Sequence, residues 1–595
     1  MSVKVNRNIL WTRIFVEQLA SLGVQYACIS PGSRSTPLAY ILSKSRKIKS
    51  FVHFDERSSA FFALGIAKFT GKPVLVVTTS GTAVAEVYPA IIEAYQQRTP
   101  LIICTADRPP ELVGTGANQT INQHNIFSNH IRWFRDLGLP SISDVGFHHL
   151  QKIALKAFRI SSSEDKGPIH LNFPYRKPLE PFSYTDKVTK KINQIKPQRT
   201  SKVNSESTRI RIEKNSSINK ILRELIEFDK GIIIAGPTEY DSNSVKKIKE
   251  LSNIIRYPVF ADGISQFRFG MNKNDRTIVS NFNFILKSQN FWTERQPEII
   301  LQFGRSPTSA LLENFLKETD ANRYLINTFG DKFDPARNAK SIVALGQDRF
   351  CEFLISKLKE EKLERTKSNW MQSFQKAEDI SEKIKSRIID KAKFPNEPSC
   401  IMDVLKLIPS GSNLVIGNSL PVRDLDNFVN INSKKIKIYF NRGASGIDGM
   451  TSTALGIASK SKPTFLITGD LSFLHDVNSL SMAVKYYIPL TIIVINNNGG
   501  GIFESLPIAN RVKHFEKFFI SPHNLDLGKI TNSFGINYQL ISTRRELQRA
   551  IKTVLNKNFP SVSEIQTDAS KSVELRNKIF NSVKKNLDKE YIIEN

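Results

Sequence analysis

The sequence is poor in cysteine and contains no long apolar run. Its 595 residues include four cysteines, which are far apart along the chain. Cys28 and Cys104 fall inside apolar, strand-like runs, which favours buried free thiols in a reducing compartment. No apolar run approaches the roughly 20 residues of a membrane span, and Arg13 and Glu17 predict an amphipathic first helix rather than a signal peptide. We therefore expect a cytoplasmic protein without a membrane span.

Acidic residues are scarce relative to basic ones. The chain has 84 Lys and Arg against 56 Asp and Glu, a formal net charge of +28. Such an excess is compatible with nucleic-acid binding. However, the charge is spread along the chain and is densest at 187–223, which has the composition of a linker, and no helix-turn-helix or aromatic-basic RNA motif stands out. We expect no nucleic-acid partner, because anionic small substrates explain the excess equally well.

The order of apolar runs predicts an α/β protein. Runs of strand length alternate with segments of helical periodicity, which is typical of parallel sheets covered by helices. A charged segment after the central sheet has opposite charges at i,i+4 spacing, so we expect a solvated connecting helix there. We predict three doubly wound, mostly parallel-sheet domains. Their expected ranges are 1–185 (N-terminal domain), 186–218 (linker), 219–352 (central domain), 353–396 (charged helical connector) and 397–595 (C-terminal domain).

One stretch, residues 469–501, places polar residues after two predicted strands. The apolar run 463–467 precedes a Gly-Asp pair, and the apolar run 490–495 precedes three asparagines. A helical segment at 474–487 lies between them and completes a βαβ unit. The two polar strand ends therefore meet at the edge where parallel sheets bind ligands.

Three residues of this stretch offer hard oxygen ligands. They are the Asp470 carboxylate, the Asn497 side-chain oxygen and the Gly499 carbonyl, and such a set suits Mg²⁺ (or Mn²⁺) that also grips phosphate oxygens. The Gly-Asp and Asn-Asn spacing resembles the metal-binding motif of thiamine-diphosphate enzymes. A Gly-Asp strand end and an Asn-rich turn are also ordinary loop chemistry, so both readings stay open on this stretch alone.

The N-terminal half contributes a carboxylate and an arginine at strand ends. Glu56 follows the apolar run 51–54 and precedes an almost wholly apolar helix, 58–68. Burial there would raise its pKa and favour a shared proton, although a helix dipole also explains an acid at this position. Arg34 follows the strand 26–29 in a rigid turn. There it can form two parallel hydrogen bonds to a ligand carboxylate, or it can pair with a structural acid.

The two halves of the chain resemble each other. The segments YQQRTPLIICTADRP and KYYIPLTIIVINNNG both run from a helix end through Pro-Leu and an apolar strand to a polar exit. The first of them begins in the last turn of a helix expected at 81–97. This likeness fits an ancient duplication. The central domain has no GxGxxG fingerprint, so no bound dinucleotide is indicated.

Two more strand exits in the C-terminal domain, at 417–424 and 441–449, pair glycine or small polar residues with an arginine. Ile447 is bulky among glycines and could wedge between the two rings of a bent cofactor, or it could pack as an ordinary core residue. Phe503 and Leu506 could close an apolar lid over the cofactor.

Eight segments together carry a family resemblance. SPGSRSTPL, HFDER, TADRPPEL, ANQTI, GNSLPVRD, NRGASGIDG, GDLSFLHD and NNNGGGIF resemble the 2-succinyl-5-enolpyruvyl-6-hydroxy-3-cyclohexene-1-carboxylate (SEPHCHC) synthases, a family of thiamine-diphosphate enzymes in menaquinone or phylloquinone biosynthesis. The likeness covers both terminal domains, is thin in the central domain and is absent from the linker and the charged connector.

The resemblance implies a reaction and an assembly. Thiamine diphosphate with Mg²⁺ or Mn²⁺ would decarboxylate 2-oxoglutarate, and the succinyl carbanion would add to isochorismate. A homodimer or homotetramer is implied, because the family builds each site between the N-terminal domain of one subunit and the C-terminal domain of another.

The resemblance also implies roles for single residues. Glu56 is the expected catalytic residue, which activates the cofactor, and the expected metal ligands are Asp470, Asn497 and Gly499. The expected cofactor contacts are Glu56, Gly417, Ser419, Leu420, Ile447, Gly469, Asp470, Leu471, Ser472, Asn497, Gly499 and Phe503. The expected substrate contacts are Ser33, Arg34, Arg108, Gln119, Ser419, Arg423, Arg442, Phe503 and Leu506. Arginines suit these substrates, because each substrate carries two carboxylates.

Two other functions remain as alternatives. The first is another thiamine-diphosphate enzyme, such as an acetolactate-synthase-like carboligase, which is expected to have a central domain shaped for FAD and fewer arginines in the pocket. A non-catalytic nucleic-acid-binding protein would show salt-sensitive DNA binding and no cofactor-dependent turnover.

Overall fold

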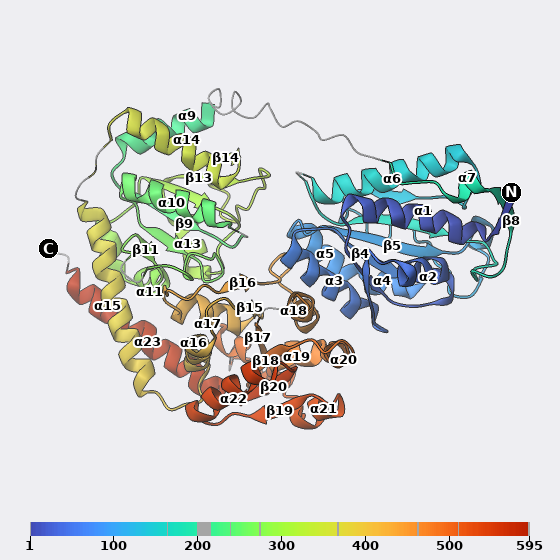
Figure 1. Ribbon diagram of the computed structural model, residues 1–595. Helices are drawn as coiled ribbons and strands as arrows, with labels where there is room; N and C mark the ends of the chain where they lie inside the picture. Colours follow the sequence, from blue (N-terminus) through green and yellow to red (C-terminus); the bar gives the residue numbers. More distant parts are fainter. Residues whose placement is uncertain are drawn as a thin grey trace.

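Three six-stranded sheets organise the chain, one in each third of the sequence (Figure 1). The computed structural model describes residues 2–163, 165–198, 216–238, 240–272, 275–363, 365, 368–460, 463–509 and 511–592. All strand pairs inside the three sheets are parallel. The prediction of an α/β protein with three doubly wound parallel-sheet domains is confirmed.

The N-terminal sheet has the strand order β3-β2-β4-β5-β7-β6. Its strands are β2 (Tyr26–Ile29), β3 (Lys49–Val52), β4 (Val74–Thr78), β5 (Leu101–Asp107), β6 (Phe134–Asp136) and β7 (Ile169–Pro174). Its helices are α1 (Arg7–Leu22), α2 (Thr36–Lys44), α3 (Glu56–Thr70), α4 (Thr82–Glu86), α5 (Tyr88–Gln96) and α6 (Asp144–Ser162). Strands β4, β5 and β7 are buried along their whole length, as expected for parallel strands covered on both faces.

The central sheet has the order β11-β10-β9-β12-β13-β14. Its strands are β9 (Gly231–Ala235), β10 (Val259–Ala261), β11 (Ile278–Val279), β12 (Ile299–Phe303), β13 (Asn322–Asn327) and β14 (Ser341–Ala344). Its helices are α9 (Ser216–Glu227), α10 (Ser242–Ile255), α11 (Phe282–Ile285), α12 (Gln289–Thr293), α13 (Ala310–Glu318) and α14 (Gln347–Glu360).

The C-terminal sheet has the order β16-β15-β17-β18-β20-β19. Its strands are β15 (Asn413–Ile416), β16 (Lys437–Tyr439), β17 (Thr464–Gly469), β18 (Leu490–Asn496), β19 (Asn537–Leu540) and β20 (Ser561–Gln566). Its helices are α16 (Glu397–Leu407), α17 (Leu420–Phe428), α18 (Met450–Ala458), α19 (Asp470–His475), α20 (Leu480–Lys485), α21 (Leu527–Ser533), α22 (Arg544–Lys557) and α23 (Ala569–Glu590).

The two terminal sheets have the same topology. Counted from the first strand of each sheet, both follow the order 2-1-3-4-6-5, whereas the central sheet follows 3-2-1-4-5-6. The likeness between the two halves of the sequence therefore extends to strand order, which supports the duplication.

The two terminal domains pack on each other through α3 and α18, which come close along their length. Both helices are buried on nearly every face. Gly65 and Gly456 lie at their crossing, and a Cβ atom on either glycine would overlap a backbone carbonyl of the other helix. The apolar helix expected after Glu56 is therefore buried between domains, because only glycine allows so close an approach.

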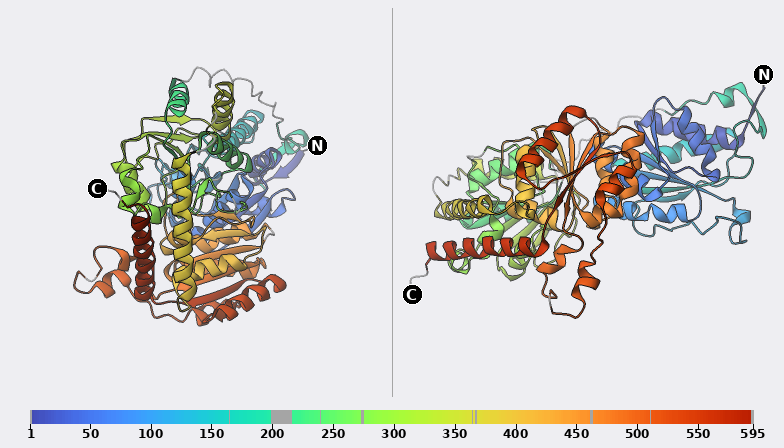
Figure 2. Two further views of the ribbon diagram at one scale, coloured as in Figure 1. Left: turned by 90° about the vertical axis from the view of Figure 1, so that its left-hand side faces the viewer. Right: turned by 90° about the horizontal axis from the view of Figure 1, so that it is seen from below.

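The charged segment after the central sheet differs from the expectation. It forms the end of α14 and a separate helix, α15 (Asn369–Lys391), which lies beside α23 (Figures 1 and 2). Trp370, Phe374 and Ile389 on α15 are buried. The prediction of a solvated connector is wrong, because these apolar residues form a stripe at helical spacing between the charged faces.

Two helices expected as single segments are divided. Residues 81–97 form α4 and α5, with Pro89 in the first turn of α5, a position that proline favours. Residues 474–487 contain the end of α19, a short 3₁₀ turn (Val477–Ser479) and α20.

The expected linker begins in ordered structure. Strand β8 (Asp186–Thr189) pairs antiparallel with β1 (Ser2–Val5), and α7 (Lys190–Asn193) follows it. These contacts tie the first part of the linker to the N-terminal domain. Residues 199–215 of the linker lie outside the described residues. Within the described part of the chain, no helix is long and apolar enough to cross a membrane.

Candidate active site

A cavity opens at the carboxyl edge of the C-terminal sheet, where β17 and β18 end. Its volume is about 260 Å³. Apart from Gly417, every residue of the C-terminal domain that the sequence predicts to bind the cofactor lines this cavity. The lining residues are Glu397, Asn418, Ser419, Leu420, Pro421, Asp424, Ile447, Gly469, Asp470, Leu471, Ser472, Ile495, Asn497, Gly499, Gly500, Gly501, Ile502 and Phe503. The βαβ unit thus brings both polar strand ends to one place, as predicted from the sequence.

Gly417 and Leu506 do not line the cavity. The Gly417 amide donates to Ile467, and a Cβ atom at this position would press on Thr468. Gly417 therefore lets β15 end close to β17. Leu506 is 44% exposed and does not line the cavity of the single chain.

Asp470 is the buried carboxylate of the cavity. Strand β17 ends at Gly469, so Asp470 begins α19, and only 2% of the residue is exposed. It accepts hydrogen bonds from the amides of Leu471 and Gly499, both at 2.8 Å, and from His523 Nε2 at 3.2 Å. Burial raises the Asp470 pKa, and these hydrogen bonds act against that rise. A cation beside it would favour the ionised form.

Asn497 presents an unused oxygen to the same cavity. Its Nδ2 donates to Glu397 Oε1 at 2.8 Å, whereas its Oδ1 is buried and has no hydrogen-bond partner. A buried acceptor without a partner is costly, and a metal ion would supply one. The donor set therefore fits a hard divalent cation, with the Asp470 carboxylate and Asn497 Oδ1 as side-chain ligands.

The glycine run after Asn497 has a defined geometric reason. Gly499 has φ 143°, and a Cβ atom there would overlap the Ile520 carbonyl. Gly500 donates its amide to the same carbonyl at 2.6 Å. These close approaches bend the chain so that the Gly499 backbone lies at the cavity beside Asp470. Within the described residues, no cluster of three or more His, Cys, Asp or Glu forms another candidate metal site.

Glu56 lies at the first position of α3, after the N-cap Asp55. It is partly buried, and burial raises its pKa, with the nearby charges of Asp55 and Glu86 acting in the same direction. The described residues that line the cavity all belong to 397–503, so Glu56 does not line it within one chain.

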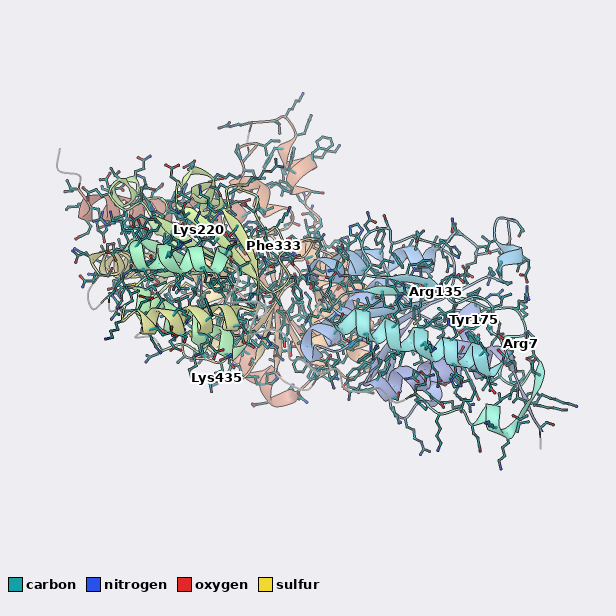
Figure 3. The ribbon with its side chains drawn as sticks, turned by 90° about the horizontal axis from the view of Figure 1, so that it is seen from above. Arg7, Arg135, Tyr175, Lys220, Phe333 and Lys435 are labelled. Carbon is teal, nitrogen blue, oxygen red and sulfur yellow. The ribbon has the colours of Figure 1, made fainter. Side chains whose placement is uncertain are left out.

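The predicted arginines form two groups, one in each terminal domain. In the N-terminal domain, Arg34 is buried and donates to the carbonyl of Tyr175, which Figure 3 labels, at 2.7 Å. Its Nε has no partner. Burial lowers the Arg34 pKa, and the charge of Arg108 lowers it further. Arg108 donates to the carbonyl of Asn118 through Nε and Nη2.

Ser33 and Gln119 lie beside this first group. Ser33 is exposed and begins the 3₁₀ turn that contains Arg34. Gln119 has φ 56°, and its carbonyl accepts from Ser80 Oγ at 2.9 Å.

The second group lies at the rim of the cavity. Arg423 donates to the Ser419 carbonyl at 2.7 Å, and Arg442 donates to Asn418 Oδ1 at 3.4 Å. Burial lowers the Arg423 pKa, and the neighbouring charge of Arg442 adds to this effect. Ser419 has φ 69°, a conformation that a residue with a side chain rarely adopts. Such strain is often found at functional sites.

Four polar residues near these groups were not expected from the sequence. His523 contacts Asp470, Glu397 contacts Asn497, and Asn418 donates to the carbonyls of Asn441 and Gly446. Glu93 of α5 accepts from the amides of Gly443 and Ala444, so the N-terminal domain holds the loop that carries Arg442. Asn418 belongs to the strand exit 417–424 named above. No local motif marks His523, Glu397 or Glu93, whose partners lie 53, 100 and 350 residues away.

Three family models match the chain. The thiamine pyrophosphate enzyme N-terminal TPP binding domain matches residues 11–126, the middle domain of thiamine pyrophosphate enzymes matches 196–416, and the C-terminal TPP binding domain matches 428–565. By fold and site, the chain is therefore a thiamine-diphosphate enzyme.

Curated relatives refine this class. A 2-succinyl-5-enolpyruvyl-6-hydroxy-3-cyclohexene-1-carboxylate synthase of Bacillus cytotoxicus is 35% identical over 95% of both chains. The enzyme of that name from Nostoc sp. is 36% identical over 95% of both chains, and that from Haloarcula marismortui is 33% identical over 98% of this chain and 99% of the relative. The chain belongs to the SEPHCHC synthase family.

Proposed function

We propose that the protein converts 2-oxoglutarate and isochorismate to SEPHCHC and CO₂ in menaquinone or phylloquinone biosynthesis, with thiamine diphosphate and Mg²⁺ (or Mn²⁺) as cofactors. The observation that carries the proposal is the pairing of Asp470 with the unpartnered Oδ1 of Asn497 in one cavity of a family member. The Gly499 carbonyl is the proposed third ligand from the chain.

The residues divide the chemical work. Thiamine diphosphate, when bound, supplies the electron sink for decarboxylation. Asp470, Asn497 and Gly499 would hold its metal, and Ser419, Leu420, Gly469, Leu471, Ser472, Ile447 and Phe503 would shape its pocket. Ile447 is the proposed wedge between the cofactor rings, and its backbone is held by Ser472 Oγ at 2.6 Å. Glu56 would hold the proton that activates the cofactor, and its raised pKa suits that role.

The two arginine groups match the charges of the substrates. Each substrate has two carboxylates, and guanidinium groups bind carboxylates through paired hydrogen bonds. Arg34 and Arg108, with Ser33 and Gln119, form the proposed group of the N-terminal domain. Arg423 and Arg442, with Ser419, form that of the C-terminal domain. The charge of Arg108 lowers the pKa of Arg34, and the charge of Arg442 lowers the pKa of Arg423. A bound anion would therefore reduce the repulsion within each pair.

A complete site would need two subunits. Glu56 does not line the cavity of its own chain. Phe54 beside it is 66% exposed, and Ile447 in the cavity is 38% exposed. Apolar surface of this kind suits an interface. We therefore propose a homodimer, or a tetramer built from it, in which Glu56, Phe54 and Leu506 help to close the site across the interface. The four buried free cysteines suit a cytoplasmic location.

Product analysis tests this function. The purified protein is incubated with thiamine diphosphate, Mg²⁺ and 2-oxoglutarate, with and without isochorismate. We expect CO₂ release and SEPHCHC formation at useful rates only when both substrates and the cofactor are present. A failure to form SEPHCHC under saturating cofactor would contradict the proposal.

The same product analysis with pyruvate in place of 2-oxoglutarate and isochorismate tests for the alternative carboligase. With pyruvate alone, an acetolactate-synthase-like enzyme would form acetolactate. The central domain has no GxGxxG sequence, so a bound dinucleotide such as FAD is not indicated. The two arginine groups favour dicarboxylate substrates over pyruvate. We expect no acetolactate.

A further inference from the structure

Asn497 depends on one neighbour for its orientation. A side-chain amide can turn by 180° and exchange its oxygen and nitrogen at almost no change in shape. Only the orientation with Oδ1 toward the cavity could bind a cation. Asn497 Nδ2 donates a hydrogen bond to Glu397 Oε1 at 2.8 Å, whereas Asn497 Oδ1 has no partner. The bond to Glu397 therefore holds the nitrogen end of the amide and leaves the oxygen end unused.

Glu397 is well suited to act as this neighbour. It begins α16, is 1% exposed and lines the same cavity as Asp470 and Asn497. Its second carboxylate oxygen is bound by Arg576 of α23. An ionised carboxylate only accepts hydrogen bonds. Both Glu397 oxygens accept hydrogen bonds here, one from Arg576 and one from Asn497 Nδ2, so the Nδ2 side of Asn497 faces the carboxylate.

Arg576 is itself fixed from a second direction. It donates through Nε to Asp424 Oδ1 at 2.8 Å and through Nη2 to Asp424 Oδ2 at 2.6 Å. Asp424 is buried on α17. Three helices that do not supply metal ligands therefore hold the Glu397 carboxylate in place, and Asp424 makes no hydrogen bond to Asn497.

We propose that Glu397 is a positioning residue for the metal site: it holds the Asn497 amide with Oδ1 directed into the cavity. This inference rests on the proposed function, because it assigns the hydrogen bond a purpose in cation binding. Glu397 does not touch the cation in this account. It acts by removing the competing orientation of Asn497, as outer carboxylates do for many metal ligands.

Binding of Mn²⁺ to the full-length protein with thiamine diphosphate tests the inference. Free and bound Mn²⁺ are measured by electron paramagnetic resonance, so the readout does not depend on turnover. In Glu397→Gln, Arg576 still donates to the side-chain oxygen, so the new amide nitrogen faces Asn497 and favours the orientation with Oδ1 turned away from the cavity. We expect Mn²⁺ affinity to fall by about 10- to 100-fold.

Asp424→Asn is the matched control. It weakens the same buried ion cluster and is as buried as Glu397, but it leaves the Glu397–Asn497 bond in place. We expect its Mn²⁺ affinity to stay within about threefold of the wild type. An equal loss in both variants would show that the effect runs through the stability of the ion cluster, and this result would overturn the proposal.

A double variant gives a rescue that a merely structural role would not produce. Asn497→Asp has two equivalent oxygens and needs no orientation, but alone it sets two carboxylates against each other. Combined with Glu397→Gln, it can accept from the new amide. We expect the double variant to bind Mn²⁺ more tightly than Glu397→Gln alone.

The outcomes separate this inference from the proposed function. If the wild type takes up no Mn²⁺ with thiamine diphosphate, the proposed function fails. If the wild type binds Mn²⁺ and Glu397→Gln binds it within threefold as tightly, or the double variant shows no rescue, only the positioning role of Glu397 is overturned.

Discussion

Single side chains carry the chemistry that we propose for this protein, and Glu56 is the proposed activator of the cofactor. It lies at the start of α3, where burial and two neighbouring carboxylates raise its pKa. Such a carboxyl can hold and return a proton near neutral pH more readily than an exposed one.

Glu56→Gln should abolish useful turnover without preventing cofactor binding. The amide has the same shape but cannot exchange a proton, so we expect kcat to fall by about 100-fold or more. Steady-state SEPHCHC formation and a thiamine diphosphate titration at saturating Mg²⁺ measure the two properties separately. Turnover within a few fold of the wild type would remove Glu56 from its assigned role.

The sequence predicts residues of this site where a strand end and a glycine or carboxylate fall together. Asp470, Asn497 and Gly499 were found in this way, since parallel strands place their carboxyl ends at one edge. Glu397 and His523 could not be found, because their partners lie 100 and 53 residues away in the sequence. Gly417 does not line the cavity, and its contact with the cofactor stays a prediction, because a glycine at a strand end can serve packing or ligand approach.

At the scale of elements, one buried carboxylate joins the two terminal domains. Asp476 follows α19 and accepts hydrogen bonds from the amide and hydroxyl of Ser452 on α18 and from Ser58 Oγ on α3. It is fully buried, and burial raises its pKa to about 6. Its protonation state therefore affects the helix pair that packs the domains together.

Asp476→Asn should change the pH dependence of stability. The pKa of Asp476 is higher in the folded state than the usual aspartate value near 4, so the folded state binds the proton more tightly. This contribution to stability is present below about pH 4 and is lost as pH rises through about 6. We expect the wild type to lose on the order of 3 kcal/mol relative to the variant over this range.

Urea unfolding of both proteins between pH 4 and 7 measures the difference. The asparagine can keep its hydrogen bonds to the two hydroxyls, since these donate or accept. A stability difference that stays constant with pH would contradict the assigned titration of Asp476.

The elements that sequence reasoning misjudged share a physical cause. In α15, charged residues at i,i+4 spacing suggested a solvated helix, but Trp370 and Phe374 bury one face against α23 and its neighbours. Local charge pairs describe only the outer surface of a helix. Whether a second face is covered depends on a partner almost 200 residues later, and the sequence pattern does not identify that partner.

At the scale of the whole molecule, we propose that two chains form each site. The C-terminal cavity and the Glu56 region are separate within one chain, and exposed apolar residues mark both. The identical strand order of the two terminal domains also suits pairing of one with the other across a two-fold axis.

Mixing two inactive variants should restore part of the activity. In a dimer of Glu56→Gln and Asp470→Ala chains, one of the two sites combines an intact N-terminal domain with an intact C-terminal domain. Random pairing gives about one quarter of the wild-type sites. SEPHCHC formation by co-expressed, differently tagged chains measures this recovery.

The control pairs two lesions in the same domain. Glu56→Gln with Arg34→Ala leaves every site with a damaged N-terminal domain, so we expect no recovery. Recovery in neither mixture, with the mixed dimers verified by their tags, would show that each chain builds its own site.

The most direct test of the central claim is the anomalous X-ray signal of Mn²⁺ in crystals grown with thiamine diphosphate. We expect one Mn²⁺ peak at the carboxyl edge of the C-terminal sheet, bound by the Asp470 carboxylate, Asn497 Oδ1 and the Gly499 carbonyl. Cofactor density without a cation between Asp470 and Asn497, or a cation bound elsewhere in the chain, would contradict it.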